Sequence, residues 1–309
     1  HSGTGKIFVA EADESDGSFL AYKPTGAIIT NIELDHVDHF PNEDAVFAVF
    51  EQFVSSIKQG GFLVACGDDV GVNNLLKRIK RTDLQIYLYG KGASNDFRID
   101  KIHLAPKGSS SVVSSTGRKV GELNLAVAGE HNLLNGLAAF AAASALGAAE
   151  TKVLDGLACF TGTKRRFELK GEVGGVKVID DYGHHPTEVK VTLTTAKNLA
   201  QAGRVIVIFQ PHRYSRTAAF ATQFSTSLSL ADFTYLLEVY AASEKPIEGV
   251  SSRLITSMMN NGEYIPNFVE VTDSVIADAQ PGDVIMTLGA GDVSSLAPII
   301  VEGLTRRFG

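Results

Sequence analysis

Short apolar runs alternate with longer segments of helical periodicity along the chain, a pattern typical of parallel sheets wrapped by helices. Between residues 96 and 128, alternating side chains punctuated by Gly and Ser predict small antiparallel strands. The other strands expected in the first half are 7–11, 27–32, 61–66 and 85–89, and the expected helices are 43–58, 71–80, 132–146 and 150–158.

A second set of alternating elements follows Glu168. Its expected strands are 176–179, 204–209, 233–237, 269–271 and 283–288, and its expected helices are 186–201, 218–228, 250–259 and 293–307. The glycines at 171, 174 and 175 punctuate the junction, so we expect one domain over 1–170 and a second over 171–309. The predicted fold class is therefore α/β with two domains.

Composition narrows the function classes. The 309 residues are 44% hydrophobic and 20% charged, and the net charge of −7 argues against nucleic acid or an anionic membrane as a partner. No apolar run is long enough to cross a membrane. Cys66 and Cys159 have neither zinc-site spacing nor the density of a disulfide scaffold, which favours a cytoplasmic protein. The chain begins with His1 and shows no signal peptide, so we expect its natural N-terminus to lie upstream.

Acidic and imidazole groups follow two expected strands of the first half. The run 11–16 begins with Glu11, and the run 31–39 contains His36. Carboxylates at the carboxyl edge of a parallel sheet suit Mg²⁺, and an imidazole beside them can ligate a metal or contact a phosphate. The plain alternatives are a solvated acidic loop and a surface histidine.

Three further motifs of the first half each allow a ligand-binding interpretation and a purely structural one. Residues 3–6, Gly-Thr-Gly-Lys, are read as an ordinary turn, because a phosphate loop follows a strand and opens a helix. Asn132 and Asn135 share one helix face, where their amides suit a base edge, or else serve as a cap plus one polar residue. The cations 164–166 suit phosphates, or else form a solvated charge run.

The second half places polar residues after three expected strands. Residues 180–188, Asp-Asp-Tyr-Gly-His-His-Pro-Thr-Glu, are too polar for packing alone, so we favour a functional use. Arginines in 210–216 can clamp a carboxylate, or else are surface residues before a helix. The turn 289–292 either faces an anion or is a plain tight turn.

Together these motifs resemble the Mur ligases, the ATP-dependent amide ligases of peptidoglycan assembly. The matching runs, in chain order, are EADESDGSF, NIELDHVDH, GEHNLLN, RRF, DDYGHHPTE and FQPHRYSRT. They span nearly the whole chain, and the combination favours the L-alanine-adding member of the family.

The resemblance implies a P-loop-type central ATPase domain, truncated at its front, followed by a Rossmann-like C-terminal domain. The family's N-terminal UDP-sugar domain and its phosphate loop are absent from the 309 residues, and Lys6 is too close to Glu11 to be the loop lysine. We therefore expect the chain to have no ligase activity by itself. No lysine lies between Lys23 and Lys58, so the carbamylated lysine of some members is not expected.

The resemblance also implies roles for individual residues. The implied reaction joins L-alanine to the lactyl carboxylate of UDP-N-acetylmuramate through an acyl phosphate, with ATP and Mg²⁺. The implied catalytic residues are Glu11, His36, Arg166 and His184, of which Glu11 and His36 hold the metal; Asn132, Asn135, Arg166, Asp181 and Tyr182 bind the nucleotide; and His184, Arg213 and Arg216 bind L-alanine or the acyl phosphate.

Two alternatives stay open at this point. A tripeptide-recycling ligase of the same family shares much of the pattern, and the chain may instead be read as a non-catalytic nucleotide-binding fragment. A hydrolase or dehydrogenase is disfavoured, because no Gly-x-Ser-x-Gly elbow and no Gly-x-Gly-x-x-Gly turn opening a βαβ unit occurs. Oligomeric state and the general base for the amine are not indicated by any motif.

Overall fold

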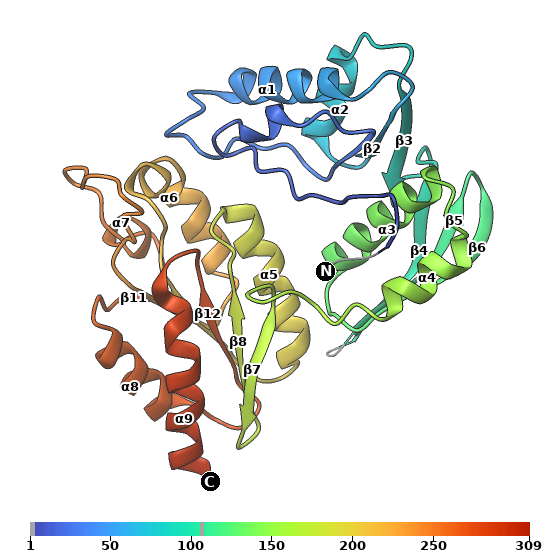
Figure 1. Cartoon of the computed structure of the whole chain (residues 1–309). Helices are drawn as coiled ribbons and strands as arrows, with labels where there is room; N and C mark the ends of the chain where they lie inside the picture. Colours follow the sequence, from blue (N-terminus) through green and yellow to red (C-terminus); the bar gives the residue numbers. More distant parts are fainter. Residues whose placement is uncertain (1–3, 106–107) are drawn as a thin grey trace.

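The computed structural model describes residues 4–105 and 108–309, which form two α/β domains, each built on a six-stranded sheet (Figure 1). This arrangement confirms the predicted fold class. Gly3 of the Gly-Thr-Gly-Lys run lies outside the described residues, and residues 4–6 form a bend that opens no helix.

The first sheet is parallel from β1 to β4 and antiparallel from β4 to β6. Its strand order is β1 (Gly26–Ile29), β2 (Phe62–Cys66), β3 (Gln85–Gly90), β4 (Phe97–Ala105), β5 (Gly108–Ser115) and β6 (Arg118–Leu125). One face is covered by α1 (Glu43–Ser56) and α2 (Val70–Arg78), the other by α3 (Glu130–Ala145) and α4 (Glu150–Ala158), and η1 (Ser18–Ala21) packs beside α1.

Strand β2 shows why this domain is layered. Leu63 and Ala65 pack toward α1 and α2, whereas Val64 and Cys66 pack toward α3, and all five residues of the strand are buried. Because successive side chains of a strand point to opposite faces, an all-apolar run requires a helix layer on each face. The side chain of Asn42 caps α1 by accepting a hydrogen bond from the backbone N–H of Ala45.

The second sheet has the order β11 (Gly262–Tyr264), β10 (Phe233–Leu236), β9 (Val205–Phe209), β12 (Val284–Leu288), β8 (Val176–Asp181) and β7 (Glu168–Val173). All its pairings are parallel except that of β7 with β8. Helices α5 (Pro186–Ala200) and α6 (Tyr214–Leu228) cover one face, and α8 (Phe268–Asp278) and α9 (Leu296–Phe308) the other, with α7 (Arg253–Thr256) and η2 (Asp292–Ser295) as short additions.

Three expected elements differ in the structure. The expected strand 7–11 is wrong: no neighbouring strand pairs with it, and Phe8 and Val9 are 88% and 86% exposed. The expected strand 269–271 is also wrong, because the Asn267 side chain caps a helix there and Val271 and Val275 form its buried face. The expected helix 250–259 shrinks to the single turn of α7.

The glycines at 174 and 175 form the two-residue turn of the β7–β8 hairpin, with φ values of 56° and 79°. Two consecutive positive φ angles are what a type I′ hairpin turn requires. Residues 168–170, placed before the expected division at 170/171, therefore belong to a strand of the second sheet, and the segment 159–167 connects the two sheets.

Candidate functional site

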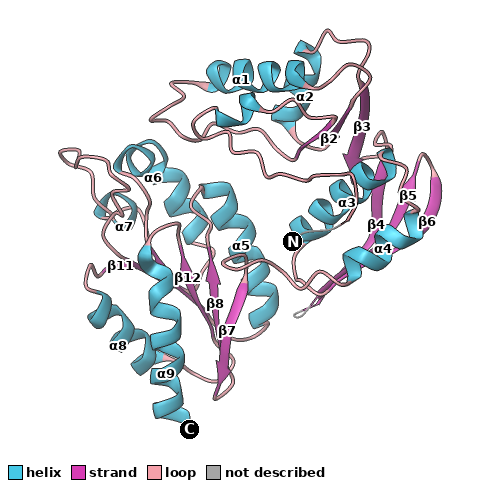
Figure 2. Cartoon of the chain, viewed as in Figure 1, coloured by secondary structure: helices cyan, strands magenta, loops and turns pink. Residues whose placement is uncertain are grey.

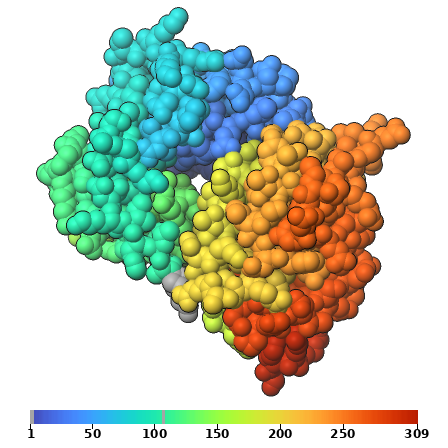
Figure 3. All heavy atoms as spheres, turned by 180° about the vertical axis from the view of Figure 1, so that it is seen from behind, coloured from blue at the N-terminus to red at the C-terminus, as the bar shows by residue number. Residues whose placement is uncertain are grey.

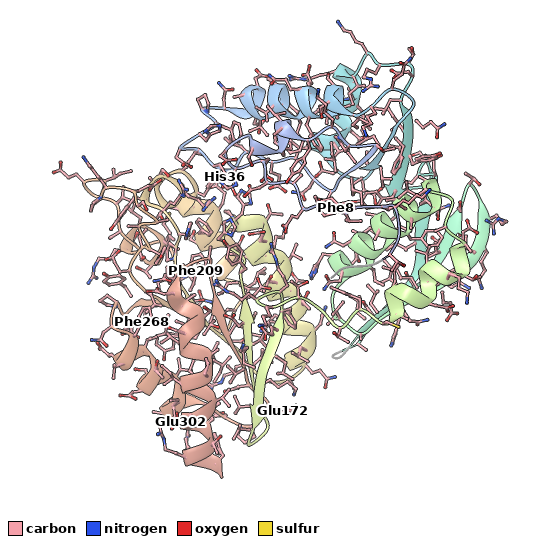
Figure 4. The ribbon with its side chains drawn as sticks, viewed as in Figure 1. Phe8, His36, Glu172, Phe209, Phe268 and Glu302 are labelled. Atoms are coloured by element: carbon pink, nitrogen blue, oxygen red, sulfur yellow. The ribbon has the colours of Figure 1, made fainter. Side chains whose placement is uncertain are left out.

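The loop after β1 contacts the second domain at the turns that follow β8 and β9. Figure 2 shows loops of the first domain lying between α1 and the second domain's α6. We call the contacts between residues 31–39 and residues 184–187 and 212–216 the domain seam. His36 lies on the side of the first domain that faces the second (Figure 4). The seam brings together His36, His184, Arg213 and Arg216, four of the residues predicted from the sequence.

Arg216 is the centre of the seam. It lies within the first turns of α6, although the sequence pattern predicts that this helix begins at 218, and its side chain is only 2% exposed. Its Nε donates to Asp35 Oδ1 at 2.8 Å, one guanidinium nitrogen lies 3.2 Å from His212 Nδ1, and the other lies 3.4 Å from His36 Nδ1. Burial raises the pKa of Asp35, but the charge and hydrogen bond of Arg216, together with the interactions with His36, outweigh burial and hold that pKa at about 2.

Three of the histidines in the seam have shifted pKa values, and the directions differ. Burial, followed by the Arg216 charge, lowers the pKa of His212 to about 4, so this ring is neutral at pH 7. Burial likewise lowers the pKa of His184, although the Glu188 charge opposes it. For His36, burial also lowers the pKa, but its interactions with Glu14 and Asp35 outweigh burial and leave the pKa raised.

His184 occupies the turn between β8 and α5. Its Nδ1 lies 3.2 Å from the Tyr182 carbonyl oxygen and 3.5 Å from Glu188, and its Nε2 lies 3.9 Å from Asp35. The turn is fixed by a capping box, in which His185 caps the helix and Glu188 accepts hydrogen bonds from the backbone N–H groups of His184 and His185. The side chain of His184 is therefore held against the seam from its own domain.

Asp181 is buried beneath this turn. It is 5% exposed, and its carboxylate accepts hydrogen bonds from the backbone N–H groups of Phe167 and Gly183 and from the Thr192 hydroxyl. Burial raises the pKa of this carboxyl, while the backbone donors oppose the shift. These hydrogen bonds fix the segment 165–167 against β8, and the nucleotide contact that the resemblance implies for Asp181 stays a prediction.

A second group of predicted residues surrounds Tyr182. The guanidinium carbons of Arg165 and Arg166 lie 4.8 Å and 5.5 Å from the centre of its ring. The side chain of Arg166 is half exposed and 3.4 Å from Glu188, whereas Arg165 donates to the carbonyl oxygens of Gly289 and Gly291. Arg166 is thus the cation of this pair that is open to a ligand.

The two asparagines lie at the start of α3, but only one of them is exposed. The Asn132 amide nitrogen donates to the Ala128 carbonyl oxygen at 2.7 Å, and Asn135 is exposed. In the same turn, His131 Nδ1 is buried without a hydrogen-bond partner in the described part of the chain, and burial followed by the Arg166 charge lowers the pKa of this imidazole. The helix start, the unpartnered nitrogen and nearby Arg166 fit a phosphorylated ligand better than a closed core.

Glu11 and His36, the expected metal pair, form no ion pair with each other in the described part of the chain, and their role as metal ligands stays a prediction. Glu11 is exposed in the irregular segment before η1, and the nearest acidic contact of His36 is Glu14, at 3.6 Å. Over residues 4–105 and 108–309, no group of three or more His, Cys, Asp or Glu side chains forms a metal cage. The oxygen donors present fit Mg²⁺ in its usual role, held by one or two carboxylates while phosphate and water complete the shell.

The sequence pattern did not identify the residues that pair with Arg213 and Arg216 across the seam. Asp35 and Asp38 stand in the acidic run 31–39, and Glu33 of the same run accepts a hydrogen bond from the Thr187 hydroxyl at 2.6 Å. Their acidic character was visible, but their partners are about 150 to 180 residues away along the chain, a pairing that no local pattern encodes.

Both sheets carry polar residues at their carboxyl edges, the place where α/β proteins bind ligands, nucleotides among them. The family description "Mur ligase middle domain" matches residues 3–143, and "Mur ligase, glutamate ligase domain" matches residues 165–291. The chain belongs to the Mur ligase family.

Individual relatives agree with this assignment. A UDP-N-acetylmuramate–L-alanine ligase of Acidothermus cellulolyticus is 44% identical, covering 100% of this chain and 66% of the relative, and one of Paenarthrobacter aurescens is 46% identical, covering 98% and 65%. The crystal structure of a UDP-N-acetylmuramate-alanine ligase from Thermotoga maritima aligns with a TM-score of 0.76 at 26% identity, covering 96% of this chain and 63% of that one. The chain thus spans about 65% of the length of these curated relatives.

Proposed function

We propose that the whole protein is an ATP-dependent ligase that joins L-alanine to the lactyl carboxylate of UDP-N-acetylmuramate through an acyl phosphate. The observation that carries this proposal is the 44% to 46% identity, along almost all of the chain, to ligases bearing that name. The cations that the second domain turns toward the first give the proposal a physical basis.

The proposed reaction requires positive charge where the carboxylate and the phosphoryl group react. A carboxylate and a phosphoryl group repel each other until fixed cations offset their charge. We assign that work to Arg213 and Arg216, together with Arg166 on the phosphates. His184 lies between the two domains, where it would contact the incoming amino acid.

The nucleotide would lie along the start of α3, with Asn132 and Asn135 at the adenine and Tyr182 near the base. Glu11 and His36 would hold Mg²⁺, which supplies charge neutralisation for the phosphate oxygens when bound. Asp181 would meet the ribose of the nucleotide from the second domain, besides fixing the segment 165–167.

We propose the cytoplasm as the compartment of the protein, on the ground of its two free cysteines. The described helices include none long and apolar enough to cross a membrane. Cys66 and Cys159 are both free thiols, as expected in a reducing compartment.

The test is phosphate release from ATP by the protein extended to the full length of its relatives. We expect release only when UDP-N-acetylmuramate and L-alanine are both present, and its loss in Glu11→Ala but not in the exposed control Glu122→Ala. Release with an L-alanyl tripeptide in place of alanine would identify a recycling ligase instead.

A second arm uses the 309-residue chain alone. Its sequence holds no Gly-Thr-x-Gly-Lys-Ser/Thr loop, so we expect no alanine-dependent phosphate release. Nucleotide binding without release in both forms of the protein would leave a non-catalytic binding module and refute the ligase.

A further inference from the structure

Helix α5 lies where the two domains meet (Figure 3). Thr187 in its first turn donates to Glu33 of the first domain, and Thr195 further along the helix lines a small pocket together with Gly129. A polar side chain in the first turn of α5 is therefore close to a ligand held between the domains. Glu188 is such a side chain, and it is 35% exposed.

The two carboxylate oxygens of Glu188 have different partners. Its Oε2 accepts hydrogen bonds from the backbone N–H groups of His184 and His185, at 2.9 Å and 3.2 Å, and its Oε1 lies 3.4 Å from a guanidinium nitrogen of Arg166. Burial raises the pKa of Glu188, but the His184 charge, the backbone donors and the Arg166 charge outweigh burial and leave the pKa lowered. One ionised carboxylate thus joins the cation assigned to the phosphates with the imidazole assigned to the amino acid.

The backbone hydrogen bonds of Glu188 do not by themselves require a charge. A capping box takes either Glu or Gln at this position, because an amide oxygen also accepts from backbone N–H groups. What the charge adds is found in the side-chain contacts, with Arg166 at 3.4 Å and with His184 Nδ1 at 3.5 Å. A glutamine at position 188 would therefore keep the helix start and lose only these two interactions.

The surroundings of His184 fix where the ring carries its proton. Nδ1 lies 3.2 Å from the Tyr182 carbonyl oxygen and 3.5 Å from Glu188 Oε2, and both oxygens are acceptors only. The neutral ring therefore has its proton on Nδ1 and a lone pair on Nε2. Nε2 is turned toward the first domain, 3.9 Å from Asp35 Oδ2, which is beyond hydrogen-bond distance. The lone pair of Nε2 thus faces the place where the two domains meet.

Charged groups reach His184 from both domains. Burial lowers the pKa of the imidazole, Glu188 opposes that shift, and Arg216 and Asp35 then lower and raise it in turn, which leaves it lowered. The ring of His212, 6.0 Å away, is neutral at pH 7. Without the Glu188 charge, His184 would be a still weaker proton acceptor.

We propose that His184 Nε2 accepts the proton that the incoming amino group must lose, and that Glu188 is the positioning residue that orients this imidazole and Arg166 together. The proposal rests on the ligase function proposed above. It follows the general pattern in which a base is oriented by a third group.

The step balances as follows. At neutral pH the amino group of L-alanine arrives as an ammonium ion, which has no lone pair for attack. Transfer of one proton to Nε2 frees that lone pair, the nitrogen forms the C–N bond with the acyl carbon, and the C–O bond to phosphate breaks. Phosphate leaves with the electron pair of that bond and takes the second N–H proton, while the imidazolium that has formed faces Glu188.

The test uses the protein extended to the full length of its relatives and measures phosphate release in Glu188→Gln and His184→Gln. We expect Glu188→Gln to keep the wild-type melting temperature, because glutamine preserves the capping oxygen. At pH 7 its kcat should fall about tenfold, and its KM for ATP should rise severalfold because Arg166 loses its orienting charge. In His184→Gln we expect kcat to fall about a hundredfold or more.

The pH dependence of these losses separates a proton acceptor from a structural residue. As the pH rises, more L-alanine arrives with a neutral amino group, so the base is needed less and both variants should approach the wild-type kcat. The control Glu302→Gln makes the same change of carboxylate to amide on α9, away from the seam (Figure 4), and should match the wild type at every pH. A loss of equal size at every pH, or no loss in Glu188→Gln, would overturn the assignment.

A spectroscopic readout on the 309-residue chain does not depend on ligase activity. In nitrogen NMR spectra of the imidazole, assigned by comparison with His184→Gln, we expect the neutral ring of His184 to carry its proton on Nδ1. The titration midpoint should lie about one pH unit lower in Glu188→Gln than in the wild type. A proton on Nε2, or an equal midpoint in the two proteins, would contradict the proposal.

The outcomes also distinguish this step from the reaction as a whole. A full-length wild type without alanine-dependent phosphate release would refute the ligase and this step with it. An active wild type with losses independent of pH would refute only the roles of His184 and Glu188. If circular dichroism shows that Glu188→Gln is unfolded, the pH dependence of His184→Gln and the position of the ring proton in the wild type decide the question.

Discussion

Inside each domain, a fully buried strand contacts helices on both faces through aliphatic and aromatic side chains, whereas the seam between the domains consists of hydrogen bonds and ion pairs. In β9, for example, Val207 and Phe209 pack toward α5 and α6 while Ile206 and Ile208 pack toward α8 and α9. The free energy of folding therefore resides mainly in the domains, and the contacts between them are free to serve function.

The two kinds of contact respond differently to their surroundings. Apolar burial is insensitive to salt and to most changes of pH, but ion pairs weaken with salt and titrate. Conditions that leave each domain folded should thus be able to change how the domains are joined.

The largest effect is expected from the core. Phe209→Ala removes a fully buried ring from the second domain, and we expect it to lower the free energy of unfolding by about 3–5 kcal/mol. Phe8→Ala removes a ring that is 88% exposed and should change it by no more than about 0.5 kcal/mol. Urea unfolding followed by circular dichroism measures both. A similar loss in the two variants would show that the segment around Phe8 is packed in solution.

The cores were the part of the molecule that the sequence predicted best. The runs of β2 and β9 are continuously apolar and that of β12 is interrupted only by Thr287, and short apolar runs between helical segments identify buried strands. The same reasoning failed at 7–11, where an apolar run finds no neighbouring strand, and at 269–271, where a capping asparagine outweighs the preference of valine for strands.

The candidate site was predicted as a set of residues and not as an arrangement. His184, Arg213 and Arg216 follow strands of one parallel sheet, so their meeting at one edge was predictable. That Asp35 of the other domain would pair with Arg216 depends on how two separately folded units dock, and no periodicity records it. The internal hydrogen bonds of Asp181 were hidden for the same reason, since its donors come from the turn and from the connecting segment.

A buried polar contact within a domain should rank second. The Thr287 hydroxyl donates to Asp180 Oδ1 at 2.6 Å between the adjacent strands β12 and β8, and both side chains are buried. Thr287→Val keeps the shape but leaves the carboxylate short of a donor, so we expect a loss of about 1–3 kcal/mol. The control Thr305→Val removes an exposed hydroxyl that bonds within its own helix. Equal stability of both variants in thermal unfolding would mean that this buried hydrogen bond contributes nothing to the pairing of β12 with β8.

Acidification tests the seam next. The folded-state pKa of His212, about 4, lies below the ordinary 6.5, so the folded state favours the neutral ring. The stability from this group is fully present above pH 6.5 and is lost as the pH falls from 6.5 toward 4. We expect the C2 proton of His212, assigned by comparison with His212→Gln, to titrate near pH 4 in NMR spectra. A midpoint near 6.5 would mean that this ring is neither buried nor beside Arg216 in solution.

The smallest effect belongs to the outer contact between Thr187 and Glu33. The bond of 2.6 Å joins two exposed side chains of different domains, so water replaces it readily once it breaks. We expect Thr187→Val to lower the free energy of unfolding by no more than about 1 kcal/mol, because solvent satisfies the freed carboxylate. Energy transfer between dyes placed on Lys80→Cys in the first domain and Lys245→Cys in the second, both exposed positions, should nevertheless fall slightly, since the contact crosses the seam. A decrease of several kcal/mol in the free energy of unfolding, without any change in energy transfer, would mean that this contact stabilises α5 within its own domain. The distinction between core and seam contacts would then not hold for this pair.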